Sequence, residues 1–325
     1  MSHFTFSKSA LALILAAMLP LCAQALTVYT GDLNRDGEVD VTDVTTLVSY
    51  VLNGTPNLNP RVADLNSDDQ VDVSDITFLI HLILDSDTSS PRLTFRVNGV
   101  SFTMVRVEPG TFMMGATDEQ LEFASSFEKP AHQVTLTKAY YISETEVTQE
   151  LYEAVMGYNN SYYKDPLNPV NRVGYVDSQS FLTQLSGWVG YKFRLPTEAE
   201  WEFAARGGNQ SRGYIYAGSD NYDDVAWCRD NSEGMIHHVG TKAPNELGLY
   251  DMSGNACEWV LDVVNLNQNP YPSEPQTDPC VNDENYAPLV RGGNFQSLYY
   301  SCRVSSRQSS YAGNGDASTT IRLVM

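Results

Sequence analysis

Residues 194–208 read Arg-Leu-Pro-Thr-Glu-Ala-Glu-Trp-Glu-Phe-Ala-Ala-Arg-Gly-Gly, which is the clearest local structural signal in the chain. Thr197 is a favoured N-cap residue, and Glu200, three positions later, completes a capping box. Acidic side chains fill the first turn, where the helix dipole favours negative charge, and Gly207 permits a left-handed stop. The stretch predicts a short helix, and capping explains the paired carboxylates Glu198 and Glu200 better than glycosidase chemistry does.

A second helix is predicted upstream of this stretch, starting at Thr148. Its apolar residues share one face, at the spacing of an amphipathic helix: Leu151, Tyr152, Val155 and Met156. From Leu93 onward, short apolar runs recur among tyrosine, glycine and asparagine residues. We therefore expect residues 93–325 to form an α+β domain with many loops.

Five motifs occur in a fixed order around these two predicted helices. They are MVRVEPGTFMMG at 104–115, ETEVT at 144–148, RLPTEAEW at 194–201, GLYDMSGN at 248–255 and RGG at 291–293. In this order they resemble the formylglycine-generating enzyme (sulfatase-modifying factor) family over residues 95 to 325. The resemblance implies a C-type-lectin-like fold, with little regular secondary structure and long loops around small antiparallel sheets.

The enzymes of this family oxidise a sulfatase cysteine to formylglycine. For an active member of the family, the resemblance implies a copper ion held by two cysteines that follow a Gly-Gly-Ser motif. Soft thiolates are the ligands that Cu(I) requires. Here Asn294 follows the two glycines, and the only cysteine of residues 291–307 is Cys302, which we interpret as a core residue or a disulfide partner. Cys257 replaces an aromatic residue of the family's Gly-Asn-x-Trp-Glu-Trp motif. These departures predict loss of the oxidase chemistry.

The same resemblance implies a structural calcium ion at the Gly-Asn turn. Its ligands map onto Asp251, the backbone of Gly254 and Ala256, and Glu258. Hard oxygen donors from one short turn, with a carboxylate at each end, suit Ca²⁺. The alternative is that the two carboxylates accept hydrogen bonds from amides of the loop. Asn231 is a weaker candidate for a second ion.

The N-terminal region contains an internal repeat, in which residues 32–43 (DLNRDGEVDVTD) match residues 64–75 (DLNSDDQVDVSD). Oxygen-bearing side chains fall at loop positions 1, 3, 5, 9 and 12, and position 7 contributes a carbonyl, which is the ligand pattern of an EF-hand-type calcium loop. The predicted calcium ligands are Asp32, Asn34, Asp36, Glu38, Asp40 and Asp43 in the first copy, and Asp64, Asn66, Asp68, Gln70, Asp72 and Asp75 in the second.

An apolar face follows each loop, over residues 41–52 and 73–83, so two helices can pack on each other. This duplicated unit resembles a type I dockerin, a small all-α calcium-binding module that binds cohesin domains and assembles secreted proteins on a scaffold or surface. The resemblance implies bound Ca²⁺, a cohesin-type partner and a setting in polysaccharide catabolism. Val41-Thr42 and Val73-Ser74 occupy the family's partner-contact positions. Asp69 replaces a turn glycine, which predicts a weaker second calcium site.

Charge and the first residues limit the function classes. Forty acidic against twenty basic residues give a net charge of −20, which excludes a nucleic-acid-binding surface. Residues 1–25 combine Lys8, an apolar run and Ala-Gln-Ala at positions 23–25, so they predict an export signal; lipidation at Cys22 is an alternative. Neither this run nor any later segment is long and apolar enough to span a membrane. We expect a secreted or cell-surface-associated protein.

The expected organisation is a signal peptide at 1–25, a dockerin at 26–86, a linker at 87–92 and the large domain at 93–325. The mature chain keeps four cysteines, which allow two disulfides in an oxidising compartment with three possible connectivities: Cys228, Cys257, Cys280 and Cys302. The histidines of the mature chain are too scattered in sequence to predict a metal triad, so we expect them on the surface or in loops: His81, His132, His237 and His238.

Three functions remain open from the sequence. The favoured one is a non-catalytic, lectin-like module that binds a glycan, peptide or protein ligand. Its contact surface is predicted in a stretch rich in Tyr, Ser and Asn: Tyr299, Tyr300, Ser301, Gln308, Ser309, Ser310, Tyr311, Asn314 and Asp316. The alternatives are a formylglycine-generating oxidase with altered copper ligation and a diversified ligand-binding receptor of the same fold.

Overall fold

The computed structural model describes residues 33–34, 39–54, 58, 60–65, 70–84, 90–264, 271–283, 287–310 and 315–325. The predicted export signal, Cys22 and the first part of the predicted linker lie outside these residues. Within them, no helix combines the length and the hydrophobicity needed to cross a membrane.

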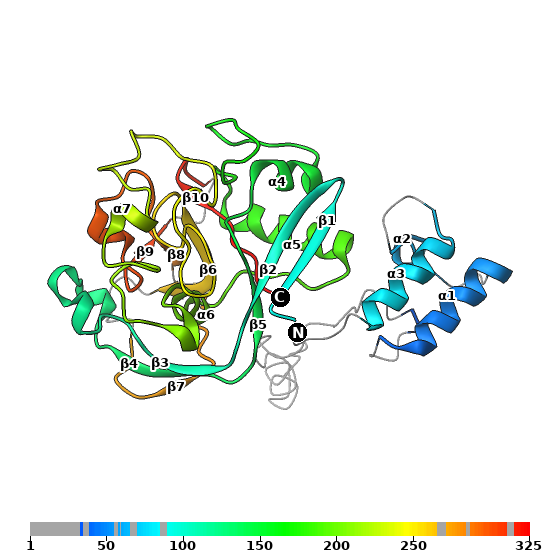
Figure 1. The fold of residues 1–325 in the computed structure, drawn as a ribbon, viewed down its shortest axis with the longest axis horizontal. Coiled ribbons are helices and arrows are strands. Elements are labelled where there is room, and N and C mark those ends of the chain that lie inside the picture. The colour runs from blue at the N-terminus through cyan, green and yellow to red at the C-terminus, as the bar shows by residue number, and fades with distance from the viewer. Residues whose placement is uncertain are drawn as a thin grey trace, which may run out of the picture.

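Three helices accompany the sequence repeat: α1 (Val41–Asn53), α2 (Pro60–Ala63) and α3 (Val73–Leu84). Helices α1 and α3 pack against each other (Figure 1), and Leu47 and Leu79, at equivalent repeat positions, are fully buried between them. Val41 and Val73, in contrast, are each 66% exposed. The buried face is therefore narrower than the apolar pattern predicted, since Leu52 and Ile80 are exposed as well.

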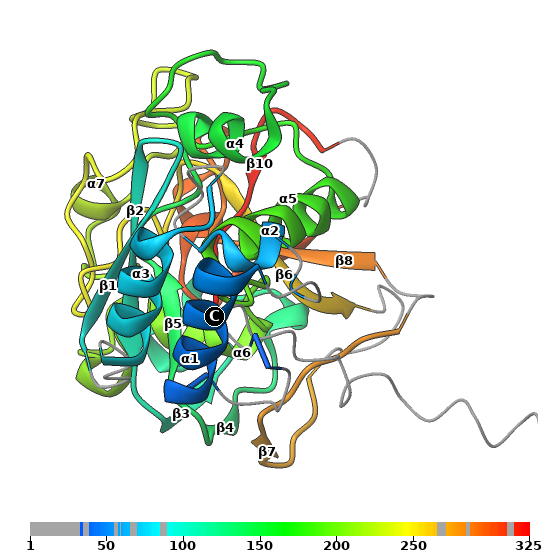
Figure 2. The same cartoon turned by 90° about the vertical axis from the view of Figure 1, so that its right-hand side faces the viewer.

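The large domain contains three small sheets among its described residues (Figures 1 and 2). The first consists of β1 (Arg92–Val97), β2 (Val100–Val107) and β5 (Tyr140–Ser143); the second of β3 (Gly110–Met114), β4 (His132–Leu136) and β7 (Gln276–Thr277); the third of β10 (Thr319–Thr320), β6 (Cys257–Val264), β8 (Ala287–Arg291) and β9 (Arg307–Ser309). Pairing is antiparallel except for β4 with β7 and β6 with β10. The predicted α+β organisation with small sheets is confirmed.

Four helices lie in the described part of this domain: α4 (Gln149–Met156), α5 (Tyr175–Val189), α6 (Glu198–Ala205) and α7 (Tyr222–Val225). Short 3-10 segments are η1 (Asp118–Phe123), η2 (Ser126–Glu128), η3 (Gly208–Gln210) and η4 (Tyr299–Cys302). The capping box before α6 is confirmed, because the Thr197 hydroxyl accepts from the Glu200 N–H at 3.1 Å and the Glu200 carboxylate accepts from the Thr197 N–H at 2.8 Å. Thr148 caps α4 as predicted. Helix α5 was not predicted.

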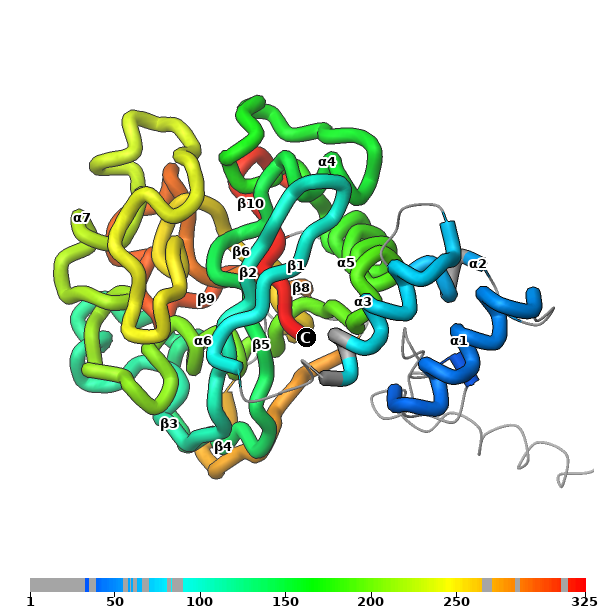
Figure 3. The backbone as a smooth tube through the Cα atoms, turned by 45° about the vertical axis from the view of Figure 1, so that its right-hand side comes forward, coloured from blue at the N-terminus to red at the C-terminus, as the bar shows by residue number. Residues whose placement is uncertain are grey.

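The C-terminal segment runs through the middle of the domain (Figure 3). Val324 pairs with Ile142 of β5 on one side and with Arg194 on the other. Two apolar clusters flank this segment, one containing Trp201 and the other Trp259, and both indole rings are fully buried. The chain end is therefore part of the core, and it fixes β5 relative to the start of α6.

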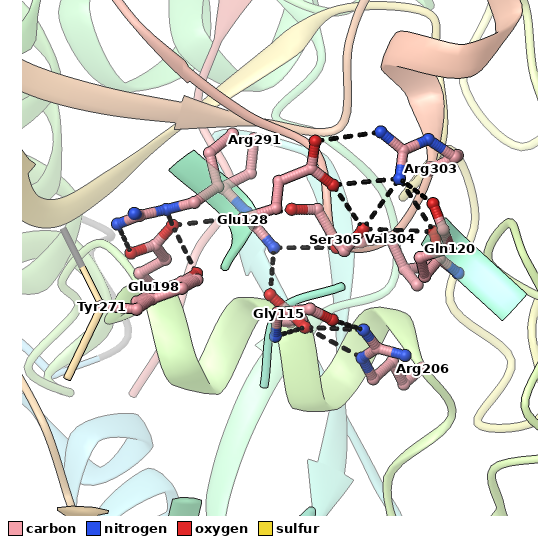
Figure 4. Close-up of polar contacts among 12 residues, drawn as sticks. Gly115, Gln120, Glu128, Glu198, Arg206, Tyr271, Arg291, Arg303, Val304 and Ser305 are labelled. Atoms are coloured by element: carbon pink, nitrogen blue, oxygen red, sulfur yellow. Dashed lines mark hydrogen bonds and ion pairs between the residues drawn. The ribbon is translucent and has the colours of Figure 1, made fainter. Parts of the chain in front are cut away.

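A buried ionic network ties α6 to the C-terminal third of the chain (Figure 4). Arg291 donates to Glu202 at 2.6 Å and to Glu198 at 3.2 Å, and Arg307 pairs with Glu198 at 2.5 Å. Although burial raises it, Arg307 and Arg291 together hold the pKa of Glu198 below its ordinary value. The capping interpretation is therefore correct for Glu200 and wrong for Glu198, which anchors residues 291–307 to the helix.

Candidate ligand-binding site

The last acidic residue of each repeat loop is buried and binds the backbone of its own loop. Asp43 accepts hydrogen bonds from the N–H groups of Leu33 at 2.6 Å and Asp40 at 3.0 Å. Asp75 repeats this arrangement with the N–H of Leu65 at 2.6 Å. The two copies of the repeat therefore share not only their sequence but also the hydrogen bonds that connect each loop to the following helix.

The other predicted ligands of these loops are described only in part. Asp40 and Asp72 accept hydrogen bonds from Thr42 and Ser74, which lower the pKa of both carboxyl groups. Asn34, Asp64 and Gln70 are also described, whereas Asp32, Asp36, Glu38, Asn66 and Asp68 lie outside the described residues. In the described ranges, no three acidic, histidine or cysteine side chains converge as a metal site made of side chains alone would require.

The predicted calcium turn of the large domain presents one orphaned oxygen. Asp251 adopts a left-handed conformation, its Oδ2 accepts from the Gly240 N–H at 2.7 Å, and its buried Oδ1 has no hydrogen-bond partner. Burial raises the pKa of Asp251 to about 6. Glu258 differs, because it accepts from the Trp201 indole at 2.5 Å and from Arg322 at 2.7 and 2.8 Å. Asp251 thus has a free ligand atom, and Glu258 already has strong partners.

Glu146, which belongs to the ETEVT motif but was not predicted as a ligand, lies beside this turn. Its carboxylate accepts from the Asn255 side chain at 2.8 Å and from the Ala256 N–H at 3.0 Å. Burial, with the nearby charges of Asp251 and Glu258, raises its pKa well above the ordinary value. These three buried carboxylates face one guanidinium, that of Arg322, so in ionised form they leave two negative charges uncompensated. That charge and the orphaned oxygen of Asp251 fit a divalent cation whose further ligands are backbone carbonyls.

The thiols near the Gly-Gly motif are buried. Gly293 has φ +70°, and a Cβ there would lie 2.8 Å from the sulfur of Cys302, so only glycine fits. Burial raises the pKa of Cys302 well above its usual value and that of Cys257 to about 12. The Asn294 side chain donates to the Cys257 sulfur at 3.2 Å. Neither sulfur is therefore reachable as a thiolate.

The structure does not contain the two disulfides that the even cysteine count allowed. Cys228, Cys257 and Cys302 form no disulfide within the described residues. Cys228 and Cys302 belong to one buried cluster, Cys257 belongs to another, and Cys280 is exposed.

An open pocket of about 470 Å³ lies near this turn and the Gly-Gly loop. On one wall, the Trp227 ring stacks on His237 at 3.8 Å between ring centres, and His238 pairs with Asp165 at 3.0 Å. Asn168 is only 7% exposed, and its Oδ1 has no hydrogen-bond partner. The lining residues are Tyr163, Lys164, Asp165, Asn168, Trp227, Met235, Ile236, His237, His238 and Thr241. We call this hollow the aromatic pocket.

The aromatic pocket rests on the two motifs that the sequence singled out. Phe295, two residues after Gly293, is fully buried and meets the Tyr163 ring edge-on at 5.7 Å. The Asn255 side chain accepts from the His237 N–H at 3.0 Å. From the sequence, we expected the histidines on the surface or in loops and did not predict this pocket. The adjacent pair His237-His238, ten residues after Trp227, is the signal that could have pointed to it.

The predicted Tyr-, Ser- and Asn-rich surface is used largely for internal contacts. Tyr299 stacks on Tyr222, and Tyr300 stacks on Phe123, with ring centres 5.3 and 5.5 Å apart. Asp316 accepts from Ser318 and Thr319. Tyr311 and Asn314 lie outside the described residues.

Comparison with known proteins assigns both regions. The family model of the sulfatase-modifying factor enzyme 1-like domain matches residues 96–325, and that of the dockerin type I domain matches residues 30–84. "Chaperone protein LppX" of Paenibacillus barcinonensis is 31% identical over 57% of this chain and 77% of its own length. The formylglycine-generating enzyme of Streptomyces coelicolor is 32% identical over 44% of this chain and 48% of its length, so the match spans about half of that enzyme.

A solved structure gives the same result. Treponema denticola variable protein 1 superposes with a TM-score of 0.65 and 28% identity, over 72% of this chain and 99% of its own. The fold and the family models agree with the motif order read from the sequence. The chain therefore belongs to the sulfatase-modifying factor enzyme 1-like (formylglycine-generating enzyme) family, with a dockerin type I domain preceding the family domain.

Proposed function

We propose that this protein is an exported, non-catalytic binding module, tethered to a cohesin-bearing scaffold or surface by its calcium-dependent dockerin. The observation that carries the proposal is a contrast at one place in the fold. The aromatic pocket is open, whereas the neighbouring sulfurs of Cys257 and Cys302 are buried with raised pKa values. Copper binding needs reachable thiolates. Binding of an extracellular glycan, peptide or protein needs only the pocket.

Calcium is proposed in the two repeat loops and at the turn of residues 251–258. In the loops, support comes from the duplicated ligand pattern and from Asp43 and Asp75 as buried loop closures. At the turn, support comes from the orphaned Oδ1 of Asp251 and from the buried carboxyl group of Glu146 beside it, whose raised pKa reflects burial without enough positive charge to hold it ionised. The ion would hold the turn that supports the pocket wall through Asn255.

The test is a screen of glycan and peptide arrays with the full chain and one pocket variant. Met235 lines the pocket and is 48% exposed, so Met235→Lys adds bulk and charge there without touching the core. Met113, 46% exposed on β3, gives the matched control Met113→Lys outside the pocket. We expect array ligands to be lost with Met235→Lys and kept with Met113→Lys. Equal binding by both variants would remove the pocket from the function.

One observation favours an oxidase as the second candidate: Cys228 and Cys302 are both free and lie in one buried cluster beside Tyr299. Titration with Cu(I), followed by incubation with a cysteine-containing sulfatase peptide under oxygen, separates the two functions. Stoichiometric copper binding with formation of an aldehyde on the peptide would replace the binding-module proposal by the oxidase.

A further inference from the structure

The segment that contains η1 and η2 buries polar side chains and exposes apolar ones. Gln120 and Glu128 are 1% and 2% exposed, whereas three apolar side chains are 46%, 40% and 37% exposed: Leu121, Phe123 and Phe127. Folding ordinarily buries Leu and Phe and leaves Gln and Glu in solvent, so this reversal is informative. Exposed apolar side chains that are grouped in this way mark a surface that binds another molecule.

Buried arginines hold the segment in this orientation. Arg303 donates to the backbone carbonyl groups of Gln120 at 3.1 Å (Figure 4) and of Phe123 at 3.0 Å. Arg307 donates to the backbone carbonyl of Phe127 at 3.0 Å. Because both guanidinium groups bind the backbone from the interior, the apolar side chains remain at the surface. The surface is therefore pre-formed, and a partner does not bear the cost of ordering it.

The apolar surface continues from η1 across η4 to α7. Phe123 stacks on Tyr300 with ring centres 5.5 Å apart and meets Tyr299 edge-on at 5.7 Å. Tyr299 in turn stacks on Tyr222 at 5.3 Å, and none of these four rings is fully buried. The η1 patch is the set of Leu121, Phe123, Tyr222, Tyr299 and Tyr300, and none of these residues lines the aromatic pocket.

Exposed acidic side chains lie on the same segments as the η1 patch. Five of them form no ion pair within the described residues: Asp118, Glu122, Asp223, Asp224 and Asp230. The one exposed cation of residues 118–128, 222–230 and 299–302 is Arg229. A partner with lysine or arginine around its apolar residues is therefore complementary in charge to this surface.

The same charge opposes a second copy of this chain as the partner. The net charge of the chain is −20, and two copies that met through the η1 patch would bring their acidic side chains together. Like charges that face each other across an interface weaken it. The patch therefore fits a different protein better than it fits itself.

From the exposed apolar side chains and their acidic surroundings we infer that the η1 patch is a docking surface for a second protein, whose contact region carries apolar residues flanked by lysine or arginine. The apolar residues of the partner cover Leu121 and Phe123, and its cations pair with Glu122 and Asp230. The inference goes beyond the proposed function, because ligand binding in the aromatic pocket does not use this surface.

The test is calorimetric titration of the full chain in calcium-containing buffer with four probes. They are a leucine–lysine peptide that forms an amphipathic helix, the same sequence with glutamate in place of lysine, pentalysine amide and maltohexaose. We expect only the leucine–lysine peptide to bind, because the patch requires apolar contact and positive charge together. Met235→Lys, in the aromatic pocket, should leave this affinity unchanged.

Two double variants test the two parts of the patch. Leu121→Ser with Phe123→Ser should weaken peptide binding about tenfold or more, because central apolar contacts supply most of the binding energy of an interface. Glu122→Gln with Asp230→Asn, which leaves the ring contacts in place, should weaken it about fivefold at an ionic strength of about 0.15 M.

Matched controls change exposed residues outside the patch. Met113→Ser with Leu167→Ser removes two apolar side chains that are each 46% exposed, and Glu153→Gln with Glu274→Gln removes two exposed charges. Each control should change the affinity for the leucine–lysine peptide by less than about twofold.

Each other outcome overturns the inference. Absence of leucine–lysine peptide binding does so, and so does equal weakening by patch and control variants, which would mean general attraction to an acidic protein. Equal binding of the glutamate peptide removes the charge requirement. Maltohexaose binding that is lost with Leu121→Ser and Phe123→Ser assigns the patch to a glycan. A dimer in sedimentation velocity that the same variant dissociates assigns it to a second copy. Peptide binding lost with Met235→Lys alone moves the peptide to the aromatic pocket, and this retains the proposed function.

Discussion

Asp262 is a buried carboxyl group whose ionisation opposes folding. It accepts from the N–H groups of Glu198 at 2.7 Å and Val281 at 2.8 Å, yet burial, together with the charge of Glu198, raises its pKa from 3.8 to about 7. The folded chain keeps a proton that the unfolded chain releases above pH 4. Its contribution to stability is therefore fully present below the unfolded pKa and is lost as the pH rises through the folded pKa.

We predict that the free energy of unfolding falls between about pH 4 and pH 7 by up to about 1.4 kcal/mol per pH unit from this group. Asp262→Asn should remove that part of the slope, although it also weakens one hydrogen bond. Asp118→Asn, at an exposed position, should keep the wild-type slope. Urea unfolding across this pH range measures it, and parallel pH profiles for wild type and Asp262→Asn would contradict the assignment.

The four cysteines differ in exposure, and this makes their oxidation state measurable. Cys280 is exposed, whereas Cys228, Cys257 and Cys302 are buried. We predict that Ellman's reagent labels Cys280 alone in the native mature protein and all four thiols after denaturation, because burial keeps the other three protonated and out of reach. Cys280→Ser should abolish the native reaction. Only two reactive thiols after denaturation would show a disulfide.

Helix α6 depends on charge pairs that the solvent does not reach. Glu202 is fully buried and bonds Arg291 at 2.6 Å, Arg206 at 2.9 Å and the Gly115 N–H at 2.8 Å. Breaking a buried pair from one side costs about 3–5 kcal/mol, because the remaining charge stays buried. Glu202→Gln should lower the free energy of unfolding by that amount. Glu200→Gln, on the same helix but paired with the partly exposed Arg194, should cost about 1 kcal/mol. Similar losses in the two variants, measured by denaturant unfolding, would contradict this ranking.

Local signals in the sequence were enough to predict helices α4 and α6 but not helix α5. Thr148 and Thr197 identify their helices through capping, which needs only neighbours in the chain. Helix α5 begins at Tyr175, and its N-cap residue, Gly174, has no side chain to cap it. The helix also contains Gly187 and several Ser and Thr residues, so its stability comes from packing of Phe181 and its neighbours in the cluster that contains Trp259. The role of Glu198 was predicted wrongly because it also depends on distant residues: its partners Arg291 and Arg307 are about a hundred residues away in the sequence.

At the scale of the whole chain, repetition and motif order predicted the dockerin and the family domain, because both are linear features. The aromatic pocket was not predictable in this way. Its residues come from 163–168 and 227–241, and they meet only because Phe295 and Asn255 support them from two further segments. Glu146 is a similar case, since its charge matters only beside Asp251 and Glu258.

The repeat loops and the turn of residues 251–258 belong to different cores, so their calcium responses should be separable. Leu47 and Leu79 belong to a small core of their own, apart from the clusters of the large domain. A ligand that binds only the folded state adds about 2.7 kcal/mol at a hundredfold excess over its Kd. For a unit as small as the dockerin this corresponds to a rise on the order of 10 °C in Tm. We predict two calorimetric transitions, both lowered when a chelator removes calcium.

Variants assign each transition to its site. Asp43→Asn and Asp75→Asn together should abolish the calcium response of the smaller transition. Each carboxylate closes its loop by accepting backbone N–H groups through both oxygens, one at 2.6 Å and the other at 3.0 Å in Asp43 and 2.9 Å in Asp75, and an amide cannot accept through both of its polar atoms. Asp251→Asn should abolish the response of the larger transition alone, and Asp118→Asn should change neither. If Asp251→Asn left the calcium response of the larger transition intact, the Oδ1 of Asp251 would be a buried oxygen without a hydrogen bond and not a calcium ligand. The calcium response of this chain would then come from the dockerin alone.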